Sequence, residues 1–365
     1  MTKTRIDLAR WGTSGQRQPE LGCLATHRAY LGKPPKRGGV VPFPCEPSEV
    51  FAKQVMGLAA RLKAIKCRDV VIGLSGGLDS TLVLLVADAA FAKLKLDKKG
   101  IHVFGMPGFG TSKRTKGNAG LLCEGLGLKL ELVSIVKSVR QHLKDIGHDG
   151  KTPDVTYENA QARMRTMILM DKANMVGGIV LGTGDLSEIA LGWSTYNGDH
   201  MSMFAVNNDV PKTVVRKVCA WWADRALRLP SSVSRPDVRL AASAVLDIIA
   251  TPVSPELVKG QVTEDKIGPY ELHDFFLWNF IMNEMGSKDL QQAAERYFLG
   301  ASQPATRNSQ PVTRELIAKT LSTFMRRFFT QAFKRNCQPD GIRVFPFELS
   351  LRGWWIPSDL GLVKL

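Results

Sequence analysis

The sequence predicts an α/β fold, a doubly wound parallel sheet, joined to a helical C-terminal part. Between residues 48 and 183, short apolar segments rich in β-branched residues alternate with longer segments that have helical spacing. From about residue 220 this alternation stops, and residues 264–335 follow a helical pattern. Strands that alternate with helices form a parallel sheet whose ligands bind at the carboxyl ends of the strands.

The first helix is expected from about Ser48, because six apolar residues recur at spacings of three and four. They are Val50, Phe51, Val55, Leu58, Leu62 and Ile65. The segment DVVIGL (69–74) follows, and its unbroken β-branched, apolar character is typical of a strand buried on both faces. The next elements are a helix over 79–94, a strand over 101–107, a helix over 115–127, a strand over 129–135, a helix over 157–176 and a strand over 178–183.

Two proline-punctuated segments, 228–237 and 251–257, separate this core from the helical residues 264–335. The stretch FFLWNFIM (275–282) is rich in large apolar residues, which predicts a helix packed on the sheet or against a second subunit. We therefore expect a basic, Gly/Pro-containing extension or docking arm over 1–45, and one domain over 46–365. Within that domain, 46–220 form the α/β core and 221–365 form mobile loops and C-terminal helices.

The chain carries 49 Lys and Arg against 34 Asp and Glu, a formal net charge of +15. Such a charge attracts phosphates, either those of nucleic acid or those of small polyphosphate substrates. The basic residues are spread along the chain, and the aromatic residues are not interleaved with them as in a base-stacking surface. We expect no nucleic-acid partner, although charge alone does not decide between the two.

Apolar runs and cysteines limit the class of protein further. No apolar run reaches the roughly 20 residues needed to span a bilayer, and the N-terminal MTKTRIDLARWG lacks the apolar segment of a secretory signal. We expect no membrane partner and a cytoplasmic location. The six cysteines include no CxxC pair, so neither a zinc site nor a dithiol redox site is expected.

The strongest chemical signal is SGGLDS, Ser75 to Ser80, between the strand DVVIGL and the next helix. Gly76 and Gly77 allow a tight turn whose backbone N–H groups, with that of Leu78, approach an anion at the positive end of the helix. Ser75 and Ser80 add hydroxyl groups, and Asp79 can hold Mg²⁺ against phosphates. The spacing and the lysine of a Walker A loop are absent. A plain glycine-rich turn with a serine cap is the alternative interpretation.

SGGLDS resembles the pyrophosphate-binding loop of the PP-loop ATP pyrophosphatases, which have an adenine nucleotide alpha-hydrolase-like fold and split ATP between the α and β phosphates. YENAQARMR (157–165), GGIVLGTGDLSEIALGWSTYNGD (177–199) and VPKT (210–213) then resemble the NAD synthetases within that superfamily. The resemblance runs from about residue 45 to 360. It implies that the carboxylate of deamido-NAD is adenylated with ATP and Mg²⁺, and that ammonia then displaces AMP to give NAD.

The resemblance also implies roles for residues on the ATP side of the site. Asp79 and Glu188 would hold Mg²⁺, Lys212 would bind ATP phosphate, and Thr183 and Ser254 would contact ATP together with the loop 75–80. Glu188 could instead be an ordinary acid in the first turn of a helix, and Lys212 could be merely solvated.

On the deamido-NAD side, the resemblance implies contacts from Arg163 and from Lys334, the latter across a homodimer interface. Arg163 could instead pair with Glu158 on its own helix, and a lysine such as Lys334 is common near a helix end. The chain departs from the short bacterial form at Phe333, where that form has histidine, and at Tyr196, where it has lysine. Asp185 could take the proton when ammonia attacks, or could simply favour the start of its helix.

Many NAD synthetases carry an N-terminal glutaminase that is far longer than the 45 residues before the predicted core. We therefore expect ammonia as the nitrogen source, either dissolved or delivered by a separate glutaminase subunit. Two alternatives are a PP-loop tRNA-modifying ATP pyrophosphatase, favoured by the basic charge, and a non-catalytic nucleotide-binding protein. Thiolating tRNA-modifying members usually have paired cysteines, which are absent here, and lysidine-forming members lack a stretch like LGTGDLSE. A non-catalytic nucleotide-binding protein is disfavoured because a sensor needs no set of metal ligands.

Overall fold

A computed structural model of the chain describes residues 43–229, 236–252, 257, 262–300 and 311–350. Its centre is a five-stranded parallel sheet with the order β3-β2-β1-β4-β5. The strands are β1 (Val70–Gly73), β2 (Ile101–Gly105), β3 (Leu130–Leu132), β4 (Ile179–Gly182) and β5 (Phe204–Ala205). The chain moves outward from β1 to β3 and then returns to the other side of β1, so the carboxyl ends of β1 and β4 border a switch point. Ligands of open α/β sheets bind at this position.

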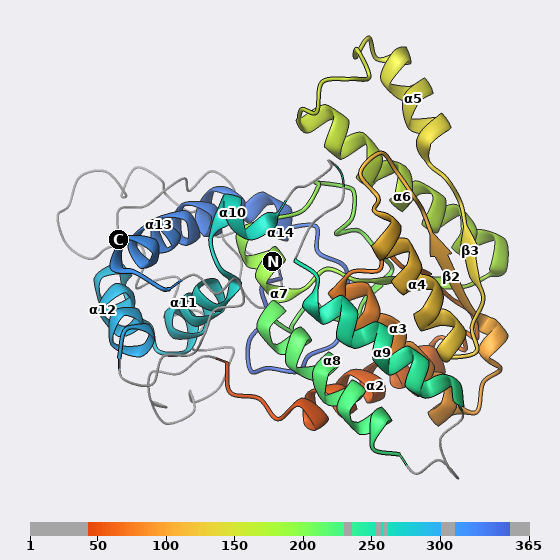
Figure 1. Cartoon of the computed structure of the whole chain (residues 1–365), viewed down its shortest axis with the longest axis horizontal. Coiled ribbons are helices and arrows are strands. Elements are labelled where there is room, and N and C mark those ends of the chain that lie inside the picture. Colours follow the sequence, from red (N-terminus) through yellow and green to blue (C-terminus); the bar gives the residue numbers. More distant parts are fainter. Residues whose placement is uncertain (1–42, 230–235, 253–256, 258–261, 301–310, 351–365) are drawn as a thin grey trace, which may run out of the picture.

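Helices cover both faces of the sheet, as the alternating pattern predicts (Figure 1). One face packs against a group of helices comprising α2 (Pro47–Ala64), α3 (Leu78–Leu94), α4 (Lys113–Gly125), α8 (Lys212–Leu227) and α9 (Pro236–Ala250). The opposite face packs against α5 (Val136–Asp145) and α6 (Val155–Val176). In β1, Val70 and Ile72 belong to the first core and Val71 to the second. Successive side chains of a strand point to opposite faces, which is why the whole segment must be apolar.

The C-terminal part is helical and lies beside the sheet domain (Figure 1). It comprises α10 (Thr263–Ile267), α11 (Tyr270–Met282), α12 (Ser287–Phe298), α13 (Arg314–Thr330) and α14 (Ala332–Arg335). The segment 275–282 lies in α11, which contacts α12, α13, α8 and the short helix α7 (Leu186–Leu191). The expectation that 275–282 packs on the sheet is therefore wrong: its rings pack on other helices, for example Phe280 on Phe324 and Phe328.

One predicted element is shorter in the structure, and several others escape the sequence analysis. The strand predicted over 129–135 is present but covers only Leu130–Leu132. Helix α5, which was not predicted, has two buried residues, Val139 and Leu143. Helix α9 lies between the two proline-punctuated segments that suggested loops. The two residues of β5 are too few to produce an alternating pattern. The 3-10 turn η2 (Lys98–Gly100) leads into β2.

Phe43, at the end of the predicted N-terminal extension, packs into the helical part of the molecule. Its side chain is 2% exposed, and its ring lies 4.9 Å from that of Trp278 and 5.2 Å from that of Phe345. Residues 1–42 lie outside the described residues, so the extension itself and the domain boundaries stay predictions. Within the described ranges, no helix is long and apolar enough to cross a membrane.

Candidate active site

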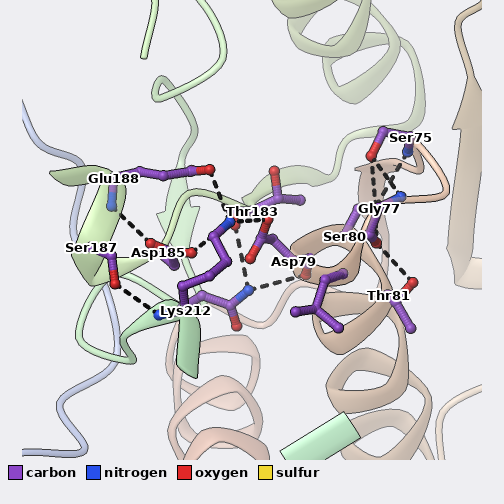
Figure 2. Close-up of polar contacts among 12 residues, drawn as sticks. Ser75, Gly77, Asp79, Ser80, Thr81, Thr183, Asp185, Ser187, Glu188 and Lys212 are labelled. Carbon is purple, nitrogen blue, oxygen red and sulfur yellow. Dashed lines mark hydrogen bonds and ion pairs between the residues drawn. The ribbon is translucent and has the colours of Figure 1, made fainter. Parts of the chain in front are cut away.

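The loop Ser75–Ser80 connects β1 to α3 and is closed by its own hydrogen bonds (Figure 2). The Gly77 amide donates to Ser75 Oγ at 3.1 Å, the Ser75 amide donates to Ser80 Oγ at 3.3 Å, and Ser80 Oγ donates to the Gly77 carbonyl at 3.2 Å. Gly76 has a φ of 79°, and a Cβ there would lie 2.4 Å from the carbonyl oxygen of Thr115. Glycine is therefore required at this position both for backbone conformation and for space.

The loop ends at the N-terminus of α3, a helix of 17 residues whose N-cap is Gly77. A glycine cap offers no side chain to the first-turn N–H groups, which begin at Leu78. These groups and the positive end of the helix dipole favour an anion in front of the loop. Ser80 is 2% exposed and bonded to the loop backbone, so its hydroxyl shapes the loop in this conformation.

Three carboxylates and one lysine meet beside this loop (Figure 2). Lys212 Nζ lies 2.5 Å from Asp79 Oδ2, 2.7 Å from Asp185 Oδ2 and 2.9 Å from Glu188 Oε1. Asp79 comes from the first turn of α3, Asp185 caps α7 by accepting from the Glu188 amide at 2.8 Å, and Lys212 begins α8. Four residues that are far apart in sequence thus form one carboxylate–lysine cluster at the carboxyl ends of β1 and β4.

The carboxylate–lysine cluster is buried and unbalanced in charge. The side chains of Lys212 and Asp185 are 0% exposed, and those of Asp79 and Glu188 are 20% and 21% exposed. Burial raises the pKa of Glu188 to about 7, with the Lys212 ammonium opposing this and Asp79 adding to it. Burial also raises the pKa of Asp185 well above its usual value. For Lys212, burial lowers the pKa, but the three carboxylates outweigh it and raise the pKa overall.

The cluster fits a divalent metal ion that prefers oxygen ligands. One carboxylate oxygen from each of Asp79, Asp185 and Glu188 lies within 4.8 Å of the other two. Asp79 Oδ1 is also buried without a hydrogen-bond partner among the described residues. Carboxylate oxygens are typical ligands of Mg²⁺. The sequence analysis predicts Asp79 and Glu188 as the ligands; in the structure Asp185, considered there only as a proton acceptor, lies in the same set of candidate ligands.

A layer of buried polar residues holds the cluster, and the sequence analysis missed it. Asn207 is 0% exposed, and its Nδ2 donates to the Asp79 carbonyl at 3.0 Å and to the Thr183 carbonyl at 3.4 Å. Gln54 Nε2 donates to Asn207 Oδ1 at 2.9 Å. Asn207 therefore ties the end of β4 to the first turn of α3.

Asp274 of α11 anchors the other side of the cluster. It accepts a hydrogen bond from Ser187 Oγ, and its Oδ2 accepts from the Thr213 amide at 2.9 Å. The Lys212 amide in turn donates to Ser187 Oγ at 2.8 Å. Burial raises the pKa of Asp274 to about 6. An acid directly before the apolar run FFLWNFIM was the signal that could have identified it, because acids are rarely buried without a partner.

The remaining predicted contacts lie around the cluster or elsewhere. Thr183 follows β4 directly and is half-buried beside the cluster. Arg163 is exposed on α6 and its Nε donates to the Tyr196 carbonyl at 3.2 Å. Lys334 Nζ donates to the carbonyls of Gly192 and Ser194 at 2.9 and 2.6 Å. Arg163 and Lys334 thus contact the same loop, residues 192–196. Ser254 lies outside the described residues.

Cations from α13 and α14 hold the carboxyl end of α7. Arg327 Nε donates to the Leu191 carbonyl at 2.9 Å, and Arg335 Nη1 donates to the Ala190 carbonyl at 2.9 Å. Together with Lys334, they satisfy carbonyls at the negative end of a six-residue helix. Helix α7 is thus fixed at both ends, by Asp185 at its start and by cations at its end.

Comparisons with known proteins agree with this arrangement. Residues 50–298 match the family model described as NAD synthase. The glutamine-dependent NAD(+) synthetase of Mycobacterium leprae is 39% identical over 332 residues, which cover 86% of this chain and 48% of that protein. That of Thermotoga maritima is 33% identical over 256 residues, covering 69% and 41%. The chain therefore spans about half the length of the curated relatives it matches.

Two solved structures share the fold. A glutamine-dependent NAD(+) synthetase from Cytophaga hutchinsonii has a TM-score of 0.63 at 16% identity, covering 86% of this chain and 54% of that one. An NMN synthetase from Francisella tularensis has a TM-score of 0.54 at 24% identity, covering 69% and 92%. The family model spans more than half of the chain, and the motifs that it covers form the glycine-rich loop and the carboxylate–lysine cluster. The chain belongs to the NAD synthase family.

Proposed function

We propose that this chain is an ATP-dependent NAD synthetase that amidates deamido-NAD. The observation that carries the proposal is the position of the carboxylate–lysine cluster directly beside an anion-binding loop, at the switch point of the sheet. An ATP pyrophosphatase needs both parts, a cradle for the phosphates and a set of groups that hold metal and cation against them. A glycine-rich turn with a serine cap would need neither a buried lysine nor three convergent acids.

The first step activates a poor electrophile. A carboxylate oxygen of deamido-NAD attacks the α-phosphorus of ATP, the bond to the bridging oxygen breaks, and pyrophosphate leaves with the electron pair. Two anions must approach each other, so the stabilisation is mainly electrostatic. The amides of the loop 75–78 would receive the phosphates, and the ammonium of Lys212, which lies among the carboxylates in this structure, would have to move to reach them. Mg²⁺, held by Asp79 and Glu188 with Asp185, supplies further neutralisation of the phosphate charge when bound.

The second step replaces AMP by nitrogen. Ammonia attacks the carbonyl carbon of the acyl-adenylate, the bond to the AMP oxygen breaks, and one proton must leave the nitrogen. Asp185 is the proton acceptor that we propose, which requires its carboxylate to be ionised and free of the metal in this step. Neither step requires a protein nucleophile.

The deamido-NAD contacts are proposed on the family resemblance. Arg163 and Lys334 meet at the loop 192–196, which makes this loop the natural neighbour of the dinucleotide. Thr183 and Ser254 are proposed to contact ATP. We also propose a homodimer, as the resemblance implies. Lys334 contacts its own chain in this structure, so a role across the interface would require it to leave these carbonyls.

The proposal is tested by incubating the purified chain with ATP, MgCl₂ and deamido-NAD, and following NAD and pyrophosphate. Ammonium chloride should support NAD formation, whereas glutamine should do so only after a separate glutaminase is added. Nicotinic acid mononucleotide is the matched rival acceptor, because one protein of the same fold is an NMN synthetase. Preference for the mononucleotide would contradict deamido-NAD as the substrate. ATP binding without pyrophosphate release would favour a nucleotide-binding protein, and pyrophosphate release that requires tRNA would favour a tRNA-modifying enzyme.

A further inference from the structure

The ammonium of Lys212 occupies the position that a metal ion would take. Its distances to the three carboxylate oxygens are 2.5, 2.7 and 2.9 Å, and those residues are the set that fits a divalent ion. A metal bound by the same oxygens would need the space at their centre. The ammonium and the metal cannot both be there, because two cations in one small carboxylate cage would repel each other and share ligands.

We propose that Lys212 is an exchangeable internal cation: its ammonium holds the three carboxylates together without metal, and a divalent metal ion displaces it toward the phosphate-binding loop. The proposal rests on the proposed function for the identity of the metal and of the phosphates. It adds that metal binding and delivery of the lysine are one coupled event.

The charges of the cluster favour such an exchange. Metal binding requires all three carboxyl groups to be ionised, and in that state one ammonium leaves two negative charges uncompensated in a buried site. A divalent ion would balance two of the three carboxylates, and the displaced ammonium nearby would balance the third. Conversely, three buried carboxylates with no cation at all would be unstable, since burying unpaired charge is costly. The lysine therefore keeps the metal ligands in place until the metal arrives.

The anchoring of Lys212 permits its side chain to move alone. Its backbone is fixed as the first residue of α8, where its amide donates to Ser187 Oγ at 2.8 Å and Ser187 is bonded to Asp274. The ring of Tyr270 lies 5.4 Å from the ammonium and lines the buried side of the cluster. Asp79 and Glu188, whose side chains are 20% and 21% exposed, contact the ammonium on the partly exposed side of the cluster.

The test compares Mn²⁺ binding to the wild type and to Lys212→Met, with MnCl₂ alone and no nucleotide. Mn²⁺ shares the oxygen preference of Mg²⁺ and can be followed by electron paramagnetic resonance and calorimetry. In the wild type, Mn²⁺ can bind only in the fraction of molecules from which the Lys212 ammonium has left the carboxylates. Removing this competing cation raises the apparent affinity for Mn²⁺ by the inverse of that fraction, so we expect binding at least about tenfold tighter in Lys212→Met. Lys172→Met is the matched control. It also removes one positive charge, but from a half-exposed pair with Glu131 at 2.9 Å, and should bind Mn²⁺ as the wild type does. Equal or weaker binding by Lys212→Met would overturn the exchange.

A second measurement needs no variant. In the metal-free wild type, Lys212 is 0% exposed and ion-paired, so it should resist an amine-acylating reagent, as quantified by mass spectrometry of its peptide. Adding MnCl₂ should increase acylation of Lys212 at least about threefold, with Lys172 unchanged, because a displaced ammonium is no longer enclosed. Unchanged or reduced acylation of Lys212 would overturn the exchange. Neither measurement includes ATP or deamido-NAD, so its failure is distinguishable from failure of the NAD synthesis assay.

Discussion

Replacing Asp79 by asparagine should abolish the activity while leaving the metal-free protein as stable as before. In the structure the carboxylate of Asp79 forms an ion pair with the Lys212 ammonium at 2.5 Å and lies close to two other carboxylates. Asparagine has the same shape and removes the charge. Lys212 stays paired with Asp185 and Glu188, so no buried cation is left without a partner.

The expected size follows from the distances. With an effective dielectric constant of about 20, the attraction between unit charges 2.5 Å apart is about 7 kcal/mol. The oxygens of the other two carboxylates lie no more than 4.8 Å away, so each repulsion between ionised groups is at least about 3.5 kcal/mol. Two repulsions therefore match or exceed the one attraction, and we expect the free energy of unfolding to fall by no more than about 1 kcal/mol. Pyrophosphate release should fall at least about a hundredfold, because a charged ligand at the reacting phosphates is lost.

The assay is urea denaturation of the metal-free protein together with pyrophosphate release in the presence of MgCl₂. Asp88→Asn is the matched control: it lies on the same helix, is 22% exposed and pairs with Lys98 at 2.5 Å, outside the carboxylate–lysine cluster. The control should retain activity, and its free energy of unfolding should fall by about 1 kcal/mol or less. A loss of more than about 3 kcal/mol in Asp79→Asn, the cost of breaking a buried ion pair, would refute the balance of charges argued above.

Three further changes test the surroundings of the site. Gly76→Ala places a Cβ 2.4 Å from the Thr115 carbonyl at a φ of 79°, so we expect a loss of at least about 1–2 kcal/mol in urea denaturation and weaker ATP binding; full ATP affinity would contradict the assigned loop. Asn207→Ala removes donors to the Asp79 and Thr183 carbonyls and should cost about 2–3 kcal/mol, with a lower Tm; an unchanged Tm would show that the tie is dispensable. His273 is buried, and burial lowers its pKa from 6.5 to about 4, so below pH 6.5 the unfolded chain gains a proton that the folded protein refuses. Between pH 8 and pH 5, the free energy of unfolding of the wild type should therefore fall by about 2 kcal/mol more than that of His273→Gln. If the free energies of unfolding of the two proteins change in parallel with pH, His273 is not the cause of the loss.

The parallel sheet, the alternation of its first four strands with helices along the chain, and the glycine-rich loop could be predicted. Each of them depends on a local sequence pattern. The segment 69–74 is apolar throughout and becomes β1, buried on both faces. SGGLDS lies between that strand and α3, with glycine at the one position where φ is positive. Elements such as β5, with two residues, depend on pairing with distant chain segments and leave no pattern of their own.

The structure brings four of the predicted site residues together, but not in the expected geometry. Asp79, Glu188, Asp185 and Lys212 converge, yet the lysine was expected at the phosphates and is found between the carboxylates. A sequence motif predicts which residue types are present in a site. The anion that a lysine contacts depends on which charged groups the fold places beside it. In this structure the nearest anions are the carboxylates of Asp79, Asp185 and Glu188, and they determine the position of the ammonium.

The C-terminal helices belong to the site even though the family match ends at residue 298. Asp185 and Glu188 both lie at the start of α7, a helix of only six residues that has little stability of its own. Its carboxyl end is held by Arg327, Lys334 and Arg335, all beyond residue 298. Arg335 is 2% exposed, and burial lowers its pKa to about 9, so its desolvation is offset by the carbonyls that it binds. Burying a guanidinium is stabilising only if those carbonyls stay in place, and keeping them in place fixes α7. The positions of Asp185 and Glu188 therefore depend on a segment more than 130 residues away in sequence.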